Sequence, residues 1–101
     1  MRAIVFAALG DATRLSVLAK LCQGKPQSIS RLTAGSNLSR QAVTKHLRVL
    51  ANAGVVRSMR VGRESLFELE PQPIDEARDY LDQVSRHWDD ALARLKLHVE
   101  D

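Results

Sequence analysis

The feature that most restricts the fold is the stretch SRQAVTKHLRVLANAG, which runs from Ser39 to Gly54. Serine is a favoured N-cap residue and glycine a favoured residue just beyond a helix end, so we expect a helix between them. At about 100° per residue, Val43, Leu47 and Leu50 fall on one side of that helix. Long polar side chains gather on the other side: Gln41, Lys45, Arg48 and Asn52. The pattern predicts a helix with one buried side and one side free to bind a partner.

Three further helices are expected before this one. Ser28 can cap a short helix, ISRLTAG, that ends at Gly35 and is followed by a tight turn. Earlier, residues 3–9 are apolar and helical in character, and Asp11 is a suitable N-cap for a helix over residues 12–22. In the helix over 12–22 we expect one buried side, formed by Leu15, Leu18, Ala19 and Cys22. Residues 28–53 therefore read as a helix-turn-helix.

The spacing of apolar residues changes after Gly54 from a helical to an alternating pattern. Residues 55–70 contain an alternating arm and a glycine-containing turn over 61–64, which predicts a two-stranded hairpin, a wing beside the helix-turn-helix. Pro71 and Pro73 end the hairpin. From residue 74 to about 100 the pattern is helical again, with apolar residues at alternating steps of three and four: Ala77, Leu81, Val84, Trp88, Ala91 and Leu95.

These elements predict one domain over residues 1–101, mainly α with a small β-hairpin, in the order α-α-α-α-β-β-α, a winged helix-turn-helix. Residues 28–53 would form the helix-turn-helix, 55–70 the wing and 74–100 a long C-terminal helix. No apolar run approaches the roughly 20 residues that span a bilayer, and the first residues carry charge too early for a secretory signal. A single cysteine excludes an internal disulfide. We expect a soluble, cytoplasmic protein that makes no contact with membranes.

Charge is distributed unevenly along the chain. Residues 1–70 carry 11 lysines and arginines against 4 acidic residues, a net charge of +7, whereas residues 71–101 carry 4 against 8, a net charge of −4. A basic first part indicates a polyanionic partner, although chance segregation of charge that only keeps a protein soluble gives the same totals.

A helix of this size fits the major groove of DNA, where side chains with paired donors and acceptors distinguish base pairs. Gln41 can bond adenine bidentately, and Thr44 can reach a base or a thymine methyl. His46, at the margin of the buried side, is expected to hydrogen-bond to the scaffold or to phosphate. The predicted DNA-binding residues are Ser39, Arg40, Gln41, Thr44, Lys45 and Arg48 on the helix and Arg57, Arg60 and Arg63 on the hairpin. The alternative is a winged-helix protein-interaction module whose basic side is merely solvated.

Three segments carry a resemblance to a known family: FAALGDATRLSVLAKL, LSRQAVTKHLRVLANAGVVRSMRVGRESLFEL and HWDDALARLK. Together they resemble the ArsR/SmtB family of bacterial winged-helix repressors, nearly from end to end. The resemblance implies a homodimer built from the first and last helices and a repressor that an effector releases from a near-palindromic operator. It leaves the effector unknown. The apolar residues that would form the dimer interface are Ile4, Val5, Leu9, Leu81, Val84, Trp88, Leu92 and Leu95.

The metal sites of that family have no clear counterpart. Family sensors carry Cys-x-Cys in the third helix, and this chain has none there. A second family site pairs Asp-x-His with His-x-x-Glu on the last helix, but here Ser85 stands before His87 in place of the aspartate, and Asp101 follows His98. We expect neither a metal nor another cofactor, and Cys22 as a small core residue, with a metal- or thiol-responsive repressor as the alternative. No catalytic constellation appears, so an enzyme is not expected.

Overall fold

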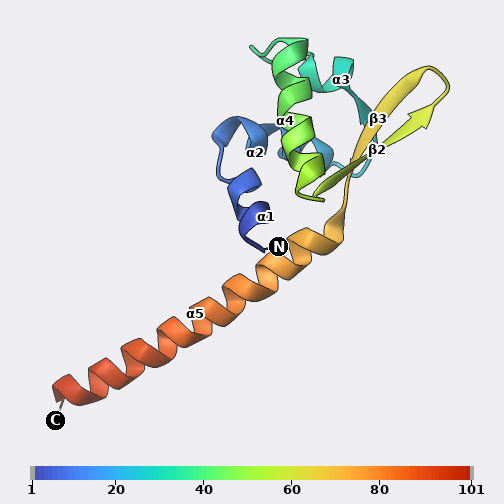
Figure 1. Cartoon of the computed structure of the whole chain (residues 1–101). Helices are drawn as coiled ribbons and strands as arrows, with labels where there is room; N and C mark the ends of the chain where they lie inside the picture. The colour runs from blue at the N-terminus through green and yellow to red at the C-terminus, as the bar shows by residue number, and fades with distance from the viewer. Residues whose placement is uncertain (1, 101) are drawn as a thin grey trace.

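The computed structural model describes residues 2–100 of the chain, so Asp101 lies outside the described part. It is a winged helix-turn-helix, mainly helical with a small antiparallel sheet, as the sequence predicts (Figure 1). The elements are α1 (Arg2–Leu9), α2 (Ala12–Leu21), β1 (Gln27–Ser28), α3 (Ile29–Thr33), α4 (Arg40–Asn52), β2 (Val56–Val61), β3 (Glu64–Leu69) and α5 (Pro71–Glu100).

The helix ends are fixed by the capping residues that the sequence predicts. Asp11, Ser28 and Ser39 have extended backbones and begin α2, α3 and α4. In each case the side-chain oxygen accepts the backbone N–H three residues on, at 2.9, 3.2 and 3.1 Å respectively. At the other ends, Gly35 and Gly54 adopt φ of +76° and +80°, where a side chain would be strained. The local chemistry of the chain therefore sets where the helix-turn-helix starts and stops.

The core lies where α1, α2, α3 and α4 meet the sheet, and α4 contributes its side of Val43, Leu47 and Leu50. The predicted buried side of α2 is wrong for three of its four residues, because Leu15 is 48% exposed and Ala19 and Cys22 are also exposed. Leu18 is buried as predicted, and Val17 and Leu21 are buried in place of the other predicted residues. The helix ends at Leu21, so Cys22 occupies the C-cap and no longer lies on a helical side. The expectation that Cys22 is a core residue is therefore also wrong.

The sheet has three strands rather than the two of the predicted hairpin, in the order β1-β3-β2. The additional strand β1 has only two residues, with Gln27 opposite Phe67 and Ser28 opposite Leu66. Ser28 is thus both a strand residue and the N-cap of α3. The wing is thereby hydrogen-bonded to the start of the helix-turn-helix.

Helix α5 leaves the body as a long arm and gives the molecule a length of 68 Å (Figure 1). It begins at Pro71, three residues before the predicted start, because proline is well accepted in the first turn of a helix. Near its start Ala77 is buried, and the ring of Tyr80 lies 5.9 Å from that of Phe6 in α1. Farther along, its large apolar side chains are exposed. Of the described helices, none is both long and apolar enough to cross a membrane.

The first helix is less available to a partner than the sequence suggests. Ile4 is 51% exposed, but Val5 belongs to the core, and Leu9 is half-buried against it. Val5 and Leu9 are therefore not free for a dimer interface, contrary to the expectation. That side of α1 packs against α2, α4 and α5 of its own chain. The exposed apolar surface lies chiefly on α5.

Candidate nucleic-acid interface

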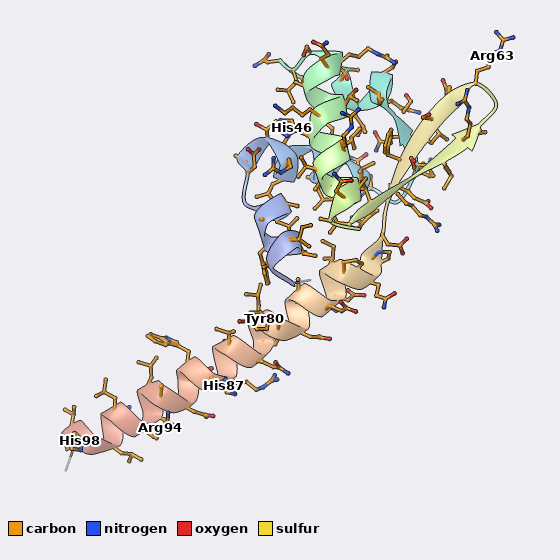
Figure 2. All side chains as sticks on the ribbon, viewed as in Figure 1. His46, Arg63, Tyr80, His87, Arg94 and His98 are labelled. Atoms are coloured by element: carbon orange, nitrogen blue, oxygen red, sulfur yellow. The ribbon has the colours of Figure 1, made fainter. Side chains whose placement is uncertain are left out.

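Helix α4 has the two sides that the sequence predicts. Val43, Leu47 and Leu50 are 0, 1 and 0% exposed, so the helix is held against α2 and α3 along one whole side. Its opposite side is exposed and carries Gln41, Lys45, Arg48 and Asn52. Because the buried side fixes the helix, the polar side chains project from a rigid support (Figure 2).

Two predicted site residues on α4 are tied to the protein. Arg40 donates from Nη1 to the Ser30 hydroxyl oxygen at 2.5 Å, which joins the starts of α3 and α4. The Thr44 hydroxyl donates to the Arg40 carbonyl at 2.8 Å. With its hydrogen used, Thr44 can offer a base only oxygen lone pairs and its methyl group. On a DNA base, Thr44 can therefore contact a hydrogen-bond donor or a thymine methyl better than a hydrogen-bond acceptor.

The side chains of five other predicted site residues have no polar contact within the described part of the protein. Among the described residues, no hydrogen bond or ion pair involves the side chains of Gln41, Lys45, Arg48, Arg60 and Arg63. Arg63 stands at the tip of the wing and points away from the body (Figure 2). These groups keep full hydrogen-bonding capacity for a partner.

The wing and the starts of α3 and α4 border one open hollow. A hollow of about 240 Å³ is lined by residues of α3, α4 and the wing, including Ser30, Arg40, Arg63 and Ser65. Two arginines that are more than twenty positions apart in sequence thus line one concave surface. The two guanidinium groups and the serine hydroxyls are donors that suit a phosphate group, and the Glu64 carboxylate lines the same hollow.

Arg57 behaves differently from the other arginines of the wing. It pairs with Glu68 directly across the β2–β3 ladder and lies 3.7 Å from a Glu70 carboxylate oxygen. The hydrogen bond from Arg57 to Glu68 is the main reason that the pKa of Arg57 is raised further. Arg57 is therefore held at the base of the wing, and Arg60 and Arg63 carry the wing's unpaired positive charge.

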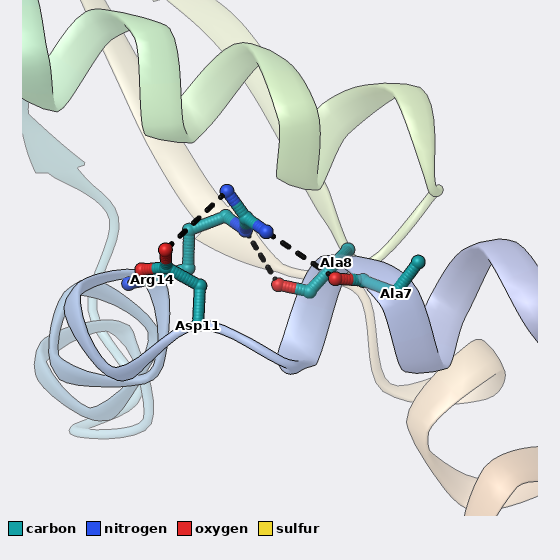
Figure 3. Close-up of polar contacts among 4 residues, drawn as sticks. All are labelled: Ala7, Ala8, Asp11 and Arg14. Carbon is teal, nitrogen blue, oxygen red and sulfur yellow. Dashed lines mark hydrogen bonds and ion pairs between the residues drawn. The ribbon is translucent and has the colours of Figure 1, made fainter.

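The junction between α1 and α2 is locked by Arg14 (Figure 3). Its guanidinium donates to the carbonyls of Ala8 at 2.7 Å and Ala7 at 3.3 Å, and lies 4.0 Å from the Asp11 carboxylate. The backbone N–H of Arg14, more than any other group, lowers the pKa of Asp11. These contacts satisfy carbonyls at the end of α1 and fix the angle at which α1 meets α2.

His46 lies beside this junction and is half-buried on α4. Its Nδ1 is buried and has no hydrogen-bond partner among the described residues, so the expected hydrogen bond to the scaffold is not formed at that nitrogen. The ring contributes slightly to the lowered pKa of Asp11.

Sequence reasoning missed three residues that shape the interface: Ser30, Glu68 and Glu70. Glu68 could have been inferred from the register of the hairpin, since it faces Arg57. Nothing in the sequence indicates that Ser30 holds Arg40 ten positions later. Within the described part of the chain, no three histidine, cysteine or acidic side chains lie together as metal ligands would.

Comparison with known proteins adds to this geometry. A family model described as a helix-turn-helix domain matches residues 9–58. The HTH-type transcriptional regulator Rv2034 of Mycobacterium tuberculosis is 34% identical over 85 residues, covering 84% of this chain and 76% of that protein. An ArsR-like transcriptional regulator from Rhodococcus sp. RHA1 is 38% identical with a TM-score of 0.82, over 94% of this chain and 89% of that one.

A more distant structure shares the fold. The homodimeric winged helix-turn-helix DNA-binding domain of Mb0332 from Mycobacterium bovis, a possible ArsR-family regulator, is 21% identical with a TM-score of 0.64. The match covers 89% of this chain and 80% of that domain.

Proposed function

Because the chain belongs to the ArsR family of helix-turn-helix, DNA-binding transcriptional regulators, we propose that it acts as a homodimeric repressor on a near-palindromic operator. The observation that carries the proposal is the exposed side of α4, whose donors have no partner in the described protein. The protein would act in the cytoplasm on its own or neighbouring genes, without catalysis.

In this proposal α4 lies in the major groove. Gln41, one residue into the helix, would bond an adenine edge, and Lys45 and Arg48 from later turns would reach guanine edges or phosphates. Ser39 and the free amides of the first turn suit a phosphate. Arg40 and Arg63, which line one hollow, would hold a second phosphate where the wing meets the helix-turn-helix.

The proposed dimer would form through the exposed apolar side chains of α5. A single winged-helix module has a footprint of roughly 600–1,000 Å² on DNA and seldom reaches operator-grade affinity alone. The apolar side chains that α5 exposes, with Ile4, form a surface that a second copy can cover around a two-fold axis. Two recognition helices would then read half-sites about 34 Å apart. The homodimeric M. bovis domain supports this assembly.

Selection of binding sites from random DNA, followed by a salt titration, tests the proposal. We expect an enriched palindrome, and an affinity that falls by about 10³–10⁵ between 50 and 200 mM salt if six to ten phosphates are contacted. The absence of an enriched palindrome would exclude sequence-specific operator binding. Salt-insensitive binding to a protein, with none to DNA, would instead favour an interaction module.

The exposure of Cys22 favours a thiol-responsive repressor as a second candidate. Cys22 lies beside the base of the wing, in a hollow that Glu68, Leu69 and Pro71 also line. Modification there would press against the segment that joins the wing to α5. Peroxide should then weaken DNA binding by wild-type protein and leave a Cys22→Ser variant unaffected. Equal responses would remove this candidate.

A further inference from the structure

Acidic residues are absent from most of the winged helix-turn-helix. Residues 12–63 contain ten lysines and arginines and no aspartate or glutamate. Six of the ten belong to the predicted DNA-binding residues, and two more are engaged by the protein itself. Arg14 donates to a carbonyl at the end of α1, and Lys20 donates from Nζ to a carbonyl of α3 at 3.0 Å. The two cations that remain without a role are Lys25 and Arg31.

Lys25 and Arg31 line one hollow, which has a volume of about 340 Å³ and is open to solvent. Gln23, Pro26 and Gln27 line the rest of it, so none of its lining residues carries a carboxylate. Both cationic side chains are exposed, and neither forms a hydrogen bond or an ion pair with another described residue. We call this hollow the Lys25–Arg31 site. It offers two cations and two side-chain amides, which are donors that phosphate oxygens accept.

The walls of the site are held in place by contacts within the protein. The Gln27 side chain donates from Nε2 to the Lys20 carbonyl at 2.6 Å, and the strand that contains Gln27 pairs with β3 of the wing. Gly24 turns the preceding loop at φ of +90°, where a side chain would be strained. Arg31 projects from α3, whose start is capped by Ser28. The two cations therefore stand on an ordered support, which lowers the entropic cost of binding an anion.

The site adjoins the surface that we propose for DNA. Helix α3 contacts α4, and β1 pairs with the wing strand β3 (Figure 1). Ser30 lines the hollow that Arg40 and Arg63 share, and Arg31 lines the Lys25–Arg31 site. Consecutive residues of a helix point about 100° apart, so the two hollows lie on adjoining sides of α3. The basic surface thus continues around α3, past the place where the wing meets the helix-turn-helix.

We propose that the Lys25–Arg31 site binds the phosphate backbone of DNA that flanks the operator, outside each half-site; this rests on the proposed operator binding and extends it. The site suits a polymer better than a small anion, because it is open and continues a surface already assigned to the same polymer. Contacts to phosphates carry no base sequence information directly. Flanking duplex of any sequence should therefore add to the affinity for the operator.

Two duplexes that contain the same operator test the proposal. The short duplex ends at the limits of the footprint of a Lys25→Gln/Arg31→Gln variant, and the long one continues for about ten base pairs, one helical turn, at each end. Wild-type protein should bind the long duplex at least about tenfold more tightly at about 100 mM salt. Its salt slope should be steeper by about 3–4, because the four added cations of a dimer each displace about 0.9 counterion. The variant should bind the short duplex as wild type does and lose most of the gain on the long one.

A matched control separates a local contact from net charge. Arg86→Gln/Lys96→Gln also removes one arginine and one lysine, but from α5, which extends away from the wing (Figure 2). This control should keep the wild-type gain on the long duplex. A Lys25→Glu/Arg31→Glu variant should instead bind the long duplex more weakly than the short one. Equal losses in the control and in the Lys25→Gln/Arg31→Gln variant would overturn the proposal.

Hydroxyl-radical footprinting locates the contact on the DNA. Wild-type protection should extend farther than that of the Lys25→Gln/Arg31→Gln variant at the outer side of each half-site, with the half-sites themselves equally protected. Footprints of equal length, or equal wild-type affinity for both duplexes, would remove this inference and leave operator binding intact. Wild-type protein that binds neither duplex would remove the proposed operator binding as well.

Inorganic phosphate tests a free anion as the occupant. We expect only weak, non-saturating shifts of the side-chain amide signals of Gln23 and Gln27 when wild-type protein is titrated with inorganic phosphate and followed by NMR. Saturable binding that is lost in the Lys25→Gln/Arg31→Gln variant, with no dependence of DNA affinity on duplex length, would show a small-anion site and contradict the proposal.

Discussion

Replacement of Trp88 by alanine should weaken the dimer while leaving the helix-turn-helix folded. Trp88 is 64% exposed and is one of the apolar residues of α5 that recur at steps of three and four, well beyond the contact with α1. Its side chain therefore adds little to the stability of an isolated protomer, and its burial is available to the dimer alone.

The magnitude follows from the exposed area. A covered tryptophan buries about 150–250 Å², so the exposed share of Trp88 is roughly 100–160 Å² per protomer. At about 25 cal/mol per Å², covering it stabilises the dimer by about 2.5–4 kcal/mol per protomer at most. Allowing about half of this for incomplete burial and for the methyl that remains, the two copies together lose roughly 2–4 kcal/mol. The dimer Kd should rise about 30- to 1,000-fold.

Sedimentation and DNA binding measure the two consequences separately. Trp88→Ala should change the affinity for a half-site little and lower the affinity for the full palindrome by about an order of magnitude or more, because linked binding is lost. Leu97→Ala, with a similarly exposed side chain that is not part of this three-and-four spacing, should behave as wild type. A Trp88→Ala protein that unfolds outright would show that Trp88 supports the protomer core. A wild-type monomer at micromolar concentration would refute the reasoning altogether.

Three other predictions concern single side chains. Gln41→Ala should cost about 1–3 kcal/mol on the preferred site and relax specificity at one base pair, as measured by competition among operator variants. Arg63→Ala should weaken all sequences alike and reduce the salt slope by about 1, whereas Arg57→Ala should change the slope less, since Arg57 is engaged by carboxylates; the reverse order would place Arg57 on DNA. Asp11 has a lowered pKa when folded, so its carboxylate stabilises the fold above its ordinary pKa of 3.8, and that contribution is lost as the pH falls through the lowered value. Asp11→Asn should therefore flatten the fall in Tm below about pH 4; an unchanged pH profile would contradict this cause.

The fold was predictable wherever local rules decide it. The starts of α2, α3 and α4 follow from Asp11, Ser28 and Ser39, because capping depends only on the next three residues. The buried side of α2 was not predictable, since apolar residues occur on more than one side of that helix and its packing partners choose between them. Strand β1 escaped notice because two residues show no alternation, and its partner β3 lies about forty positions away.

The residues of the candidate site also include some that could be predicted from the sequence and some that could not. Gln41 and Lys45 could be assigned to the exposed side of α4 from the helical period alone. The fixed positions of Arg40 and Arg57 could not, because each depends on a contact across the fold, with Ser30 and with Glu68. Charge counts treat every arginine as equally free, and only the three-dimensional structure separates engaged arginines from unengaged ones.

The pairing of β1 with β3 has a consequence for the DNA itself. Since Gln27 and Ser28 join the wing to the start of α3, the wing and α4 form one stiff frame with a fixed span between Arg63 and the reading helix. The distance between Arg63 and α4 is then one that a bound duplex has to match. A duplex whose groove width does not match the span must be bent or narrowed to fit, at a cost that depends on the stiffness of its sequence. Operators should then differ in affinity at base pairs that no side chain touches, with flexible pyrimidine–purine steps favoured where the duplex must yield.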